Sequence, residues 1–206
     1  MLTAAGAALL WAGLSIGNAA SAATATGFSV EIAGDARYVV HGGGPDKEVQ
    51  VQNGDLKPLA AAVTNAAAKA NRGALSVVAR DDTNYQSLID VVAAASEITV
   101  NELRVTTKTR HVAIRLTPAD GSSFLIHVVI APNNTYSVAV DAFPEVLHGI
   151  PALRNSLSAA HKQHGQLAAS IECDRATSMA TFADAITAMQ ANGVVRYTFV
   201  TQTNQK

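Results

Sequence analysis

The chain repeats its own apolar pattern at a spacing of 94 residues, the distance from Leu56 to Ile150, which predicts two related modules rather than one domain. The alignment runs without a gap from residues 56–107 onto residues 150–201. The aligned apolar pairs are Leu59 with Leu153, Val63 with Leu157, Val77 with Ile171, Leu88 with Phe182, Val92 with Ile186 and Val105 with Phe199. Because identity between the copies is weak, the predicted duplication rests on this shared pattern.

The composition fits a folded protein with two small cores. Of 206 residues, 49% are hydrophobic and 15% are charged, which is enough apolar sequence for two modules of about 85–90 residues. The formal net charge of −1 provides no basic field for nucleic acid, so we expect no nucleic-acid partner. The single cysteine, Cys173, excludes an intramolecular disulfide and is expected to be a buried thiol.

The amino-terminal segment predicts export. No charged side chain precedes Glu31, residues 4–16 are almost continuously apolar, and Ala20-Ser21-Ala22 is typical of a signal-peptide cleavage site. The apolar run is shorter than the roughly 20 residues that a spanning helix needs. We therefore expect residues 1–22 to be a signal peptide, cut before Ala23, or an apolar anchor. The expected location is the periplasm, or the inner membrane facing the periplasm.

The periodicities predict an α+β fold made of two tandem small modules, each a sheet covered on one face by two helices. Each module is expected to follow the order β-β-β-α-β-α-β, the first over residues 27–107 and the second over residues 110–202. The second is expected to open with strands at residues 111–116, 123–130 and 136–140. Residues 108–110 are expected to be a short hinge between the modules.

Two tracts resemble the ExbD/TolR family of biopolymer-transport proteins. Residues 76–92 (SVVARDDTNYQSLIDVV) are similar to the strand, acidic turn, tyrosine and apolar helix of that family, and residues 188–201 (AMQANGVVRYTFVT) to its glycine and last strand. The resemblance covers both modules. It implies an envelope protein of proton-motive-force-driven biopolymer transport, with an inner-membrane motor-type protein and an energy-transducer protein as partners, and homo-oligomers as a further option.

The sequence departs from this family at its amino terminus. Family members have a transmembrane helix with a buried aspartate that carries protons, whereas no carboxylate occurs here before Glu31. An ionisable group within the membrane is what proton coupling needs, so we expect this chain to carry no protons. The resemblance then implies an accessory role through contacts with periplasmic proteins or the cell wall.

Two other classes of function stay open: a small periplasmic hydrolase and a purely structural adaptor. The hydrolase would use Asp81 or Asp174, each of which follows a central strand and precedes a helix. A carboxylate in that position more often caps the helix, and no His or Ser beside either aspartate suggests a nucleophile and base. We expect no enzyme activity and no catalytic residues.

A metal site is the remaining candidate. His161 and His164 lie one helical turn apart, with His148 upstream. Two imidazoles so spaced can hold a metal, but histidines at the end of a helix also interact favourably with its dipole. We expect neither a metal nor any other cofactor.

Overall fold

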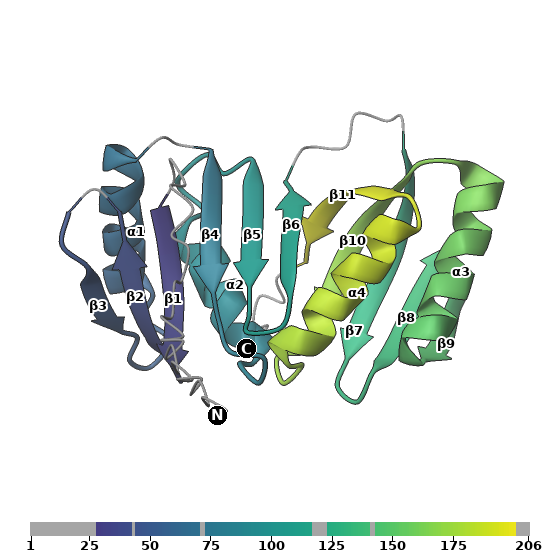
Figure 1. The fold of residues 1–206 in the computed structure, drawn as a ribbon, viewed down its shortest axis with the longest axis horizontal. Helices are drawn as coiled ribbons and strands as arrows, with labels where there is room; N and C mark the ends of the chain where they lie inside the picture. The colour runs from purple at the N-terminus through teal and green to yellow at the C-terminus, as the bar shows by residue number, and fades with distance from the viewer. Residues whose placement is uncertain (1–27, 43, 71–72, 117–122, 141–142, 201–206) are drawn as a thin grey trace, which may run out of the picture.

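The computed structural model describes residues 28–42, 44–70, 73–116, 123–140 and 143–200 (Figure 1). In the first half of the chain the elements are β1 (Phe28–Gly34), β2 (Arg37–His41), β3 (Lys47–Gln50), α1 (Lys57–Lys69), β4 (Ala74–Val78), α2 (Tyr85–Ala94), β5 (Glu102–Thr106) and β6 (His111–Arg115). Their strands form a six-stranded sheet of order β3-β2-β1-β4-β5-β6. Strands β1, β4 and β5 are parallel, whereas β2, β3 and β6 complete the sheet by antiparallel pairing.

The second half repeats the first. Its elements are β7 (Phe124–Ala131), β8 (Thr135–Val140), β9 (Phe143–His148), α3 (Gly149–His164), β10 (Leu167–Cys173), α4 (Met179–Ala191) and β11 (Val194–Phe199). The strands form a five-stranded sheet of order β11-β10-β7-β8-β9. The predicted α+β class is therefore confirmed, and both halves show three strands, a helix, a strand, a helix and a strand.

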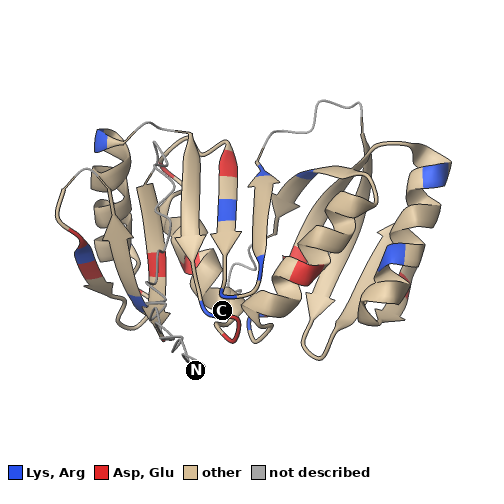
Figure 2. Ribbon diagram, viewed as in Figure 1, with Lys and Arg blue, Asp and Glu red and all other residues tan. Residues whose placement is uncertain are grey.

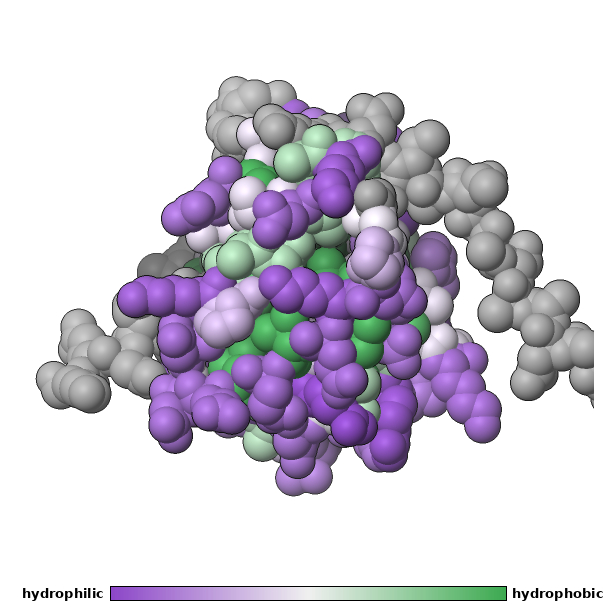
Figure 3. All heavy atoms as spheres, turned by 90° about the vertical axis from the view of Figure 1, so that its left-hand side faces the viewer, coloured by the Kyte–Doolittle hydropathy of each residue, from purple (hydrophilic) through white to green (hydrophobic). Residues whose placement is uncertain are grey.

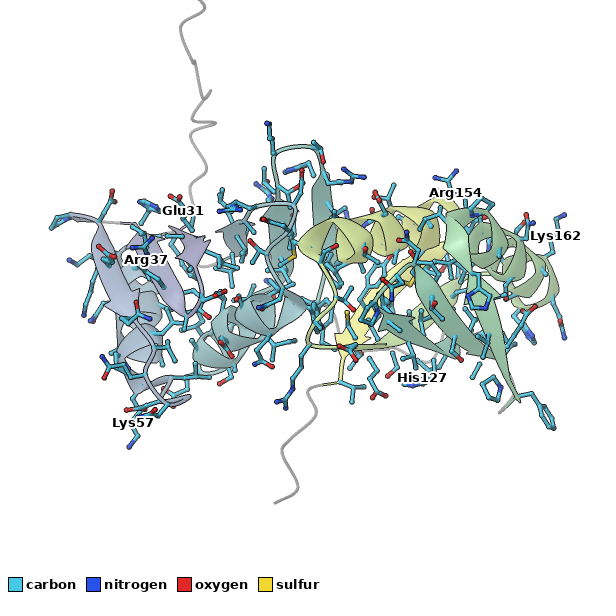
Figure 4. All side chains as sticks on the ribbon, turned by 90° about the horizontal axis from the view of Figure 1, so that it is seen from below. Glu31, Arg37, Lys57, His127, Arg154 and Lys162 are labelled. Carbon is cyan, nitrogen blue, oxygen red and sulfur yellow. The ribbon has the colours of Figure 1, made fainter. Side chains whose placement is uncertain are left out.

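The helices of the two halves cover opposite sides of the molecule. In Figure 1, α1 and α2 lie behind the first sheet, whereas α3 and α4 lie in front of the second. Glu31 on the open face of the first sheet and His127 on the open face of the second consequently project to opposite sides in Figure 4. The side chains that alternate inward from the strands meet the helices, and one continuous hydrophobic core extends through both halves.

The two copies differ in length at one turn. Tyr38 pairs with Val49 across β2 and β3, and Tyr136 pairs with Leu147 across β8 and β9, so these strands are equivalent at a spacing of 98. From α1 and α3 onward the spacing is 94. The four additional residues of the first copy fall at residues 51–54, where Asn53 and Gly54 adopt positive φ angles of 53° and 73°. In the second copy, β9 passes directly into α3.

Strand β6 corrects the assignment of residues 111–116. The sequence predicted this strand as the first of the second module, but β6 pairs with β5 in the first sheet. Residues 107–110 form the loop of that hairpin, in which Thr107 N–H donates to Arg110 C=O at 2.8 Å, and are not a hinge. An alternating pattern identifies a strand but not its partner, which explains the error. The division into domains at residues 27–107 and 110–202 stays a prediction.

The sequence analysis predicted a signal peptide or a membrane anchor at the amino terminus. Among the described residues, no helix combines the length and the apolarity needed to cross a membrane. The predicted signal peptide or anchor, residues 1–22, lies outside the described residues, so its cleavage stays a prediction.

Candidate functional site

The loops that precede α2 and α4 meet at the centre of the molecule. Asn84 is the N-cap of α2 and accepts a hydrogen bond from Ser87 N–H, and Ser178 is the N-cap of α4 and accepts one from Thr181 N–H. These two caps are 94 residues apart, hence equivalent, and they form an antiparallel bridge with each other. A local two-fold axis therefore passes between them.

Four backbone hydrogen bonds extend this symmetry. They are Tyr85 N–H to Thr177 C=O (2.8 Å), Met179 N–H to Thr83 C=O (2.7 Å), Gln86 N–H to Arg175 C=O (3.3 Å) and Ala180 N–H to Asp81 C=O (3.0 Å). The first two bonds are equivalent, and so are the last two: adding 94 to the first-half residue and subtracting 94 from the second-half residue converts one bond into the other. The first N–H groups of a helix have no partner within it, and here each half supplies partners for the other. The contact is isologous, as in a two-fold homodimer.

Aromatic side chains fill the space beside this bridge. The Phe182 ring lies 5.1 Å from that of Tyr85 and 6.1 Å from that of Phe199, measured between ring centroids. Leu88 and Phe182 are both buried, at the same position in α2 and α4. This confirms the sequence-based pairing of Leu88 with Phe182.

The Tyr85 hydroxyl offers a test of this interface. It is buried without a hydrogen-bond partner among the described residues, which costs stability. We expect Tyr85→Phe to raise the free energy of unfolding by about 1 kcal/mol. Tyr197→Phe is the matched control, since the Tyr197 hydroxyl donates to Val194 C=O at 3.0 Å, and it should lower that free energy by about 1 kcal/mol. Chemical denaturation measures both, and a loss of stability in Tyr85→Phe would contradict this placement.

A second contact joins the β5–β6 hairpin to α4. Arg110 donates from Nε and Nη2 to the two carboxylate oxygens of Asp184, at 2.9 and 3.0 Å. Gln190 Nε2 donates to Ala113 C=O in β6 at 2.6 Å. The β5–β6 hairpin, whose residues 108–110 were predicted to be a hinge, is thus held against the second half by side chains of α4.

Asp81 is engaged in structural hydrogen bonds. Its carboxylate accepts from the Thr107 hydroxyl and, at 3.0 Å, from the Thr109 hydroxyl. The Thr107 bond is the main cause that lowers the pKa of the Asp81 carboxyl below its usual value. An ionised carboxylate held by two threonines stabilises the turn between β5 and β6. No histidine or serine contacts it in the described part of the chain.

Asp174 has a similar local role in the second half. Its carboxylate accepts from Ala176 N–H at 2.8 Å, and its C=O accepts from Thr177 N–H. This is the hydrogen bonding of a turn before a helix. Neither Asp174 nor Asp81 lines the two clefts that lie beside Arg80, so the structure does not bring these carboxylates into a common pocket there.

The three histidines that the sequence suggested as metal ligands make separate contacts in the structure. His161 Nδ1 contacts Gly165 C=O at 2.6 Å, and the His164 ring stacks on Phe124 with 3.8 Å between centroids. His148 lies at the end of β9, where its Nδ1 is 3.5 Å from the Thr135 hydroxyl. Within the described ranges, no three His, Cys, Asp or Glu side chains gather as metal ligands do.

Cys173 is a structural residue. It lies at the end of β10 and is buried, as the sequence predicted. Burial raises the pKa of its thiol to about 12, which keeps it protonated at neutral pH.

The edge strands at the two ends of the molecule, β3 and β9, expose different kinds of side chain. Strand β3 is short, exposes Lys47, Glu48 and Gln50, and forms an ion pair from Arg37 to Glu48 at 3.8 Å. Figure 3 shows hydrophilic side chains around a narrow apolar strip at this end of the molecule. Short, charged outer strands resist pairing with other chains.

Strand β9 lies at the opposite end and exposes apolar side chains. Phe143 is 83% exposed and Val146 is 64% exposed. Within the described residues β9 pairs only with β8, so its other edge carries open backbone groups. Pro144 removes one N–H donor near the start of the strand, which leaves residues 145–148 for pairing. The sequence analysis missed this strand because Pro144 interrupts it and the adjacent Val146 and Leu147 break the alternation.

Charge does not concentrate over either module. Figure 2 shows Lys, Arg, Asp and Glu interspersed over the ribbon, without a large region of one sign. This agrees with the formal net charge of −1 and favours contact through backbone and apolar groups.

Comparisons with protein-family models, with curated proteins and with solved structures gave no match to this chain.

Proposed function

We propose that this is an envelope protein of the ExbD/TolR type, accessory to proton-motive-force-driven biopolymer transport, which acts by binding periplasmic proteins and not as an enzyme. The resemblance of residues 76–92 and 188–201 to that family supports the proposal, as does the α+β fold of both halves. The accessory role follows from the lack of Asp or Glu before Glu31. Its partners are then an inner-membrane motor-type protein and an energy-transducer protein.

The open edge of β9 is the observation that best supports binding. An extended segment can add to a sheet edge through main-chain hydrogen bonds, while side chains of the edge strand provide selectivity. Val146 lies on the open face of the second sheet, opposite Ser137 of β8, and Leu125 of β7 is also exposed on that face. We propose that an extended partner segment with alternating apolar residues pairs with β9 and covers Val146.

A genetic test uses one substitution at each outer strand. In the native host, deletion of this chain is expected to reduce uptake that depends on the proton-motive force, and the natural chain should restore it. Val146→Lys should restore about tenfold less, since it places a charge in the centre of the contact. Glu48→Lys on β3 is the control and should restore uptake in full. Both sites are exposed, so stability should change by less than about 0.5 kcal/mol.

Two results would contradict the proposal. Uptake in the deletion strain equal to that of the parent would remove the transport role, and full restoration by Val146→Lys would remove β9 as the binding edge.

A further inference from the structure

The backbone groups of β9 alternate between β8 and the open edge. Gly149 N–H donates to Asn134 C=O at 2.8 Å, which extends the register of β8 with β9 by one pair. Because every second residue of an antiparallel strand bonds to the same neighbour, this bond fixes which backbone groups of β9 are used by β8. The residues whose backbone groups point away from β8, toward the open edge, are Pro144, Val146 and His148.

Two of these residues offer only part of the usual set of backbone groups. Pro144 has no N–H, so it offers an acceptor only. His148 is the N-cap of α3, and the C=O of an N-cap residue accepts the first hydrogen bond of its helix, so His148 offers a donor only. Val146 offers both. The order along the open edge of β9 is therefore acceptor, then acceptor with donor, then donor.

This order is complementary to itself. A second copy of β9 that runs antiparallel, centred on Val146, presents the same groups in reverse. Val146 then exchanges two hydrogen bonds with Val146 of the other copy, and each His148 N–H donates to the Pro144 C=O of the other copy. A register centred on Glu145 would instead oppose two carboxylates, and one centred on Leu147 would direct Val146 N–H to the C=O that α3 already uses.

The exposed side chains of β9 fit the same register. On the open face, Val146 meets Val146 of the other copy, so each covers apolar surface of the other. On the helix face, Phe143 lies opposite Gly149 of the other copy. Among the described residues, only Pro151 Cδ comes within 4 Å of a Cβ added at Gly149, so an aromatic ring has room there. An aromatic ring across from an edge glycine stabilises a sheet.

Helix α3 leaves the approach to β9 free. Ser156 Oγ donates to Glu145 of β9 at 2.9 Å, so this side of α3 lies over the edge strand. Ala152, one turn earlier, lies on the same side of the helix. Both side chains are small, which allows α3 of a second copy to approach across the axis.

We propose that β9 pairs with β9 of a second copy of this chain, centred on Val146, and joins two five-stranded sheets across a two-fold axis. Strand β3, at the other end of the molecule, is short and exposes charged side chains, so association stops at the dimer. The dimer covers the edge that the proposed function assigns to a partner segment, so the two contacts exclude each other. The self-pairing does not itself rest on the transport role.

Sedimentation equilibrium of the purified full chain, from about 1 to 500 µM, tests the dimer in the absence of any partner. The natural chain and Glu48→Lys are expected to show the same monomer–dimer equilibrium. Val146→Lys places two like charges opposite each other and should raise the dissociation constant at least about tenfold. Failure of the transport test together with an intact dimer would remove the proposed function alone.

Cysteine substitutions test the register. Residues of a hydrogen-bonded antiparallel pair have Cα atoms about 5.5 Å apart, within the range of a disulfide, so mild oxidation should link two chains of Val146→Cys. Pro144→Cys should not link, because its two copies lie about 13 Å apart along the strands. The natural chain, whose Cys173 is buried, gives the background. Circular dichroism verifies that each variant is folded.

Three results would overturn the proposal. They are a natural chain that stays monomeric throughout the concentration range, dimerisation of Val146→Lys equal to that of the natural chain, and cross-linking of Pro144→Cys as rapid as that of Val146→Cys.

Discussion

Truncation of Phe182 to alanine is expected to lower the free energy of unfolding by about 3–5 kcal/mol. Phe182 is fully buried, and its ring contacts Tyr85 of the first half and Phe199 of the second. Removing the ring takes away buried apolar area and leaves a cavity between the halves that the backbone bridge prevents from collapsing. The loss should therefore exceed that of an average core substitution.

Urea denaturation followed by circular dichroism and by tyrosine fluorescence measures this loss. Val195→Ala, at an exposed position in β11, is the control and should change stability by less than about 0.5 kcal/mol. Because one core joins both halves, we expect the two probes to report one transition. A loss below about 1 kcal/mol for Phe182→Ala would show that its ring is not central to the interface.

Substitution of Gly193 by alanine is expected to cost about 2–4 kcal/mol, for two reasons that add. Gly193 ends α4 with a φ of +86°, a conformation that alanine adopts with difficulty. An added Cβ would also lie 2.3 Å from His161 Nδ1, and that ring is held by its contact with Gly165 C=O. The loop after α4 thus passes directly against the end of α3.

Gly165→Ala separates the two reasons. Gly165 has a similar φ of +79°, with a ψ of −133° that residues other than glycine rarely adopt, and nothing lies within 4 Å of an added Cβ. Gly165→Ala should therefore cost only the conformational part, about 1–2 kcal/mol. In the background of His161→Ala, the additional cost of Gly193→Ala should fall to this smaller value. Thermal or urea unfolding measures the series, and equal costs for both glycines in the natural background would contradict the close approach of His161.

The helical parts of the fold could be predicted because their signals are local. Leu88 and Phe182 were expected as equivalent apolar positions, and the structure buries both at the same position of α2 and α4. Apolar spacing on a helix depends only on neighbours in sequence. The turn between β7 and β8 is equally local, because asparagine tolerates the positive φ angles that Asn133 and Asn134 adopt there.

The partners of strands and loops could not be predicted in this way. Strand β6 alternates as well as β7 does, and nothing in that pattern assigns it to the first sheet. The hydrogen bonds of Tyr85 and Met179 to the other half use backbone groups that every residue type except proline has. The two clefts beside Arg80 lie where pairing of β1 with β4 ends, which also depends on the backbone.

The most direct test of the proposed function is photo-cross-linking in living cells from position 146 in β9. We expect an adduct that mass spectrometry identifies as the motor-type or energy-transducer protein of the inner membrane. Position 48 in β3, the outer strand of the first sheet, is the matched control and should give no such adduct. The absence of an adduct from position 146, or the same adduct from both positions, would contradict binding at the edge of β9.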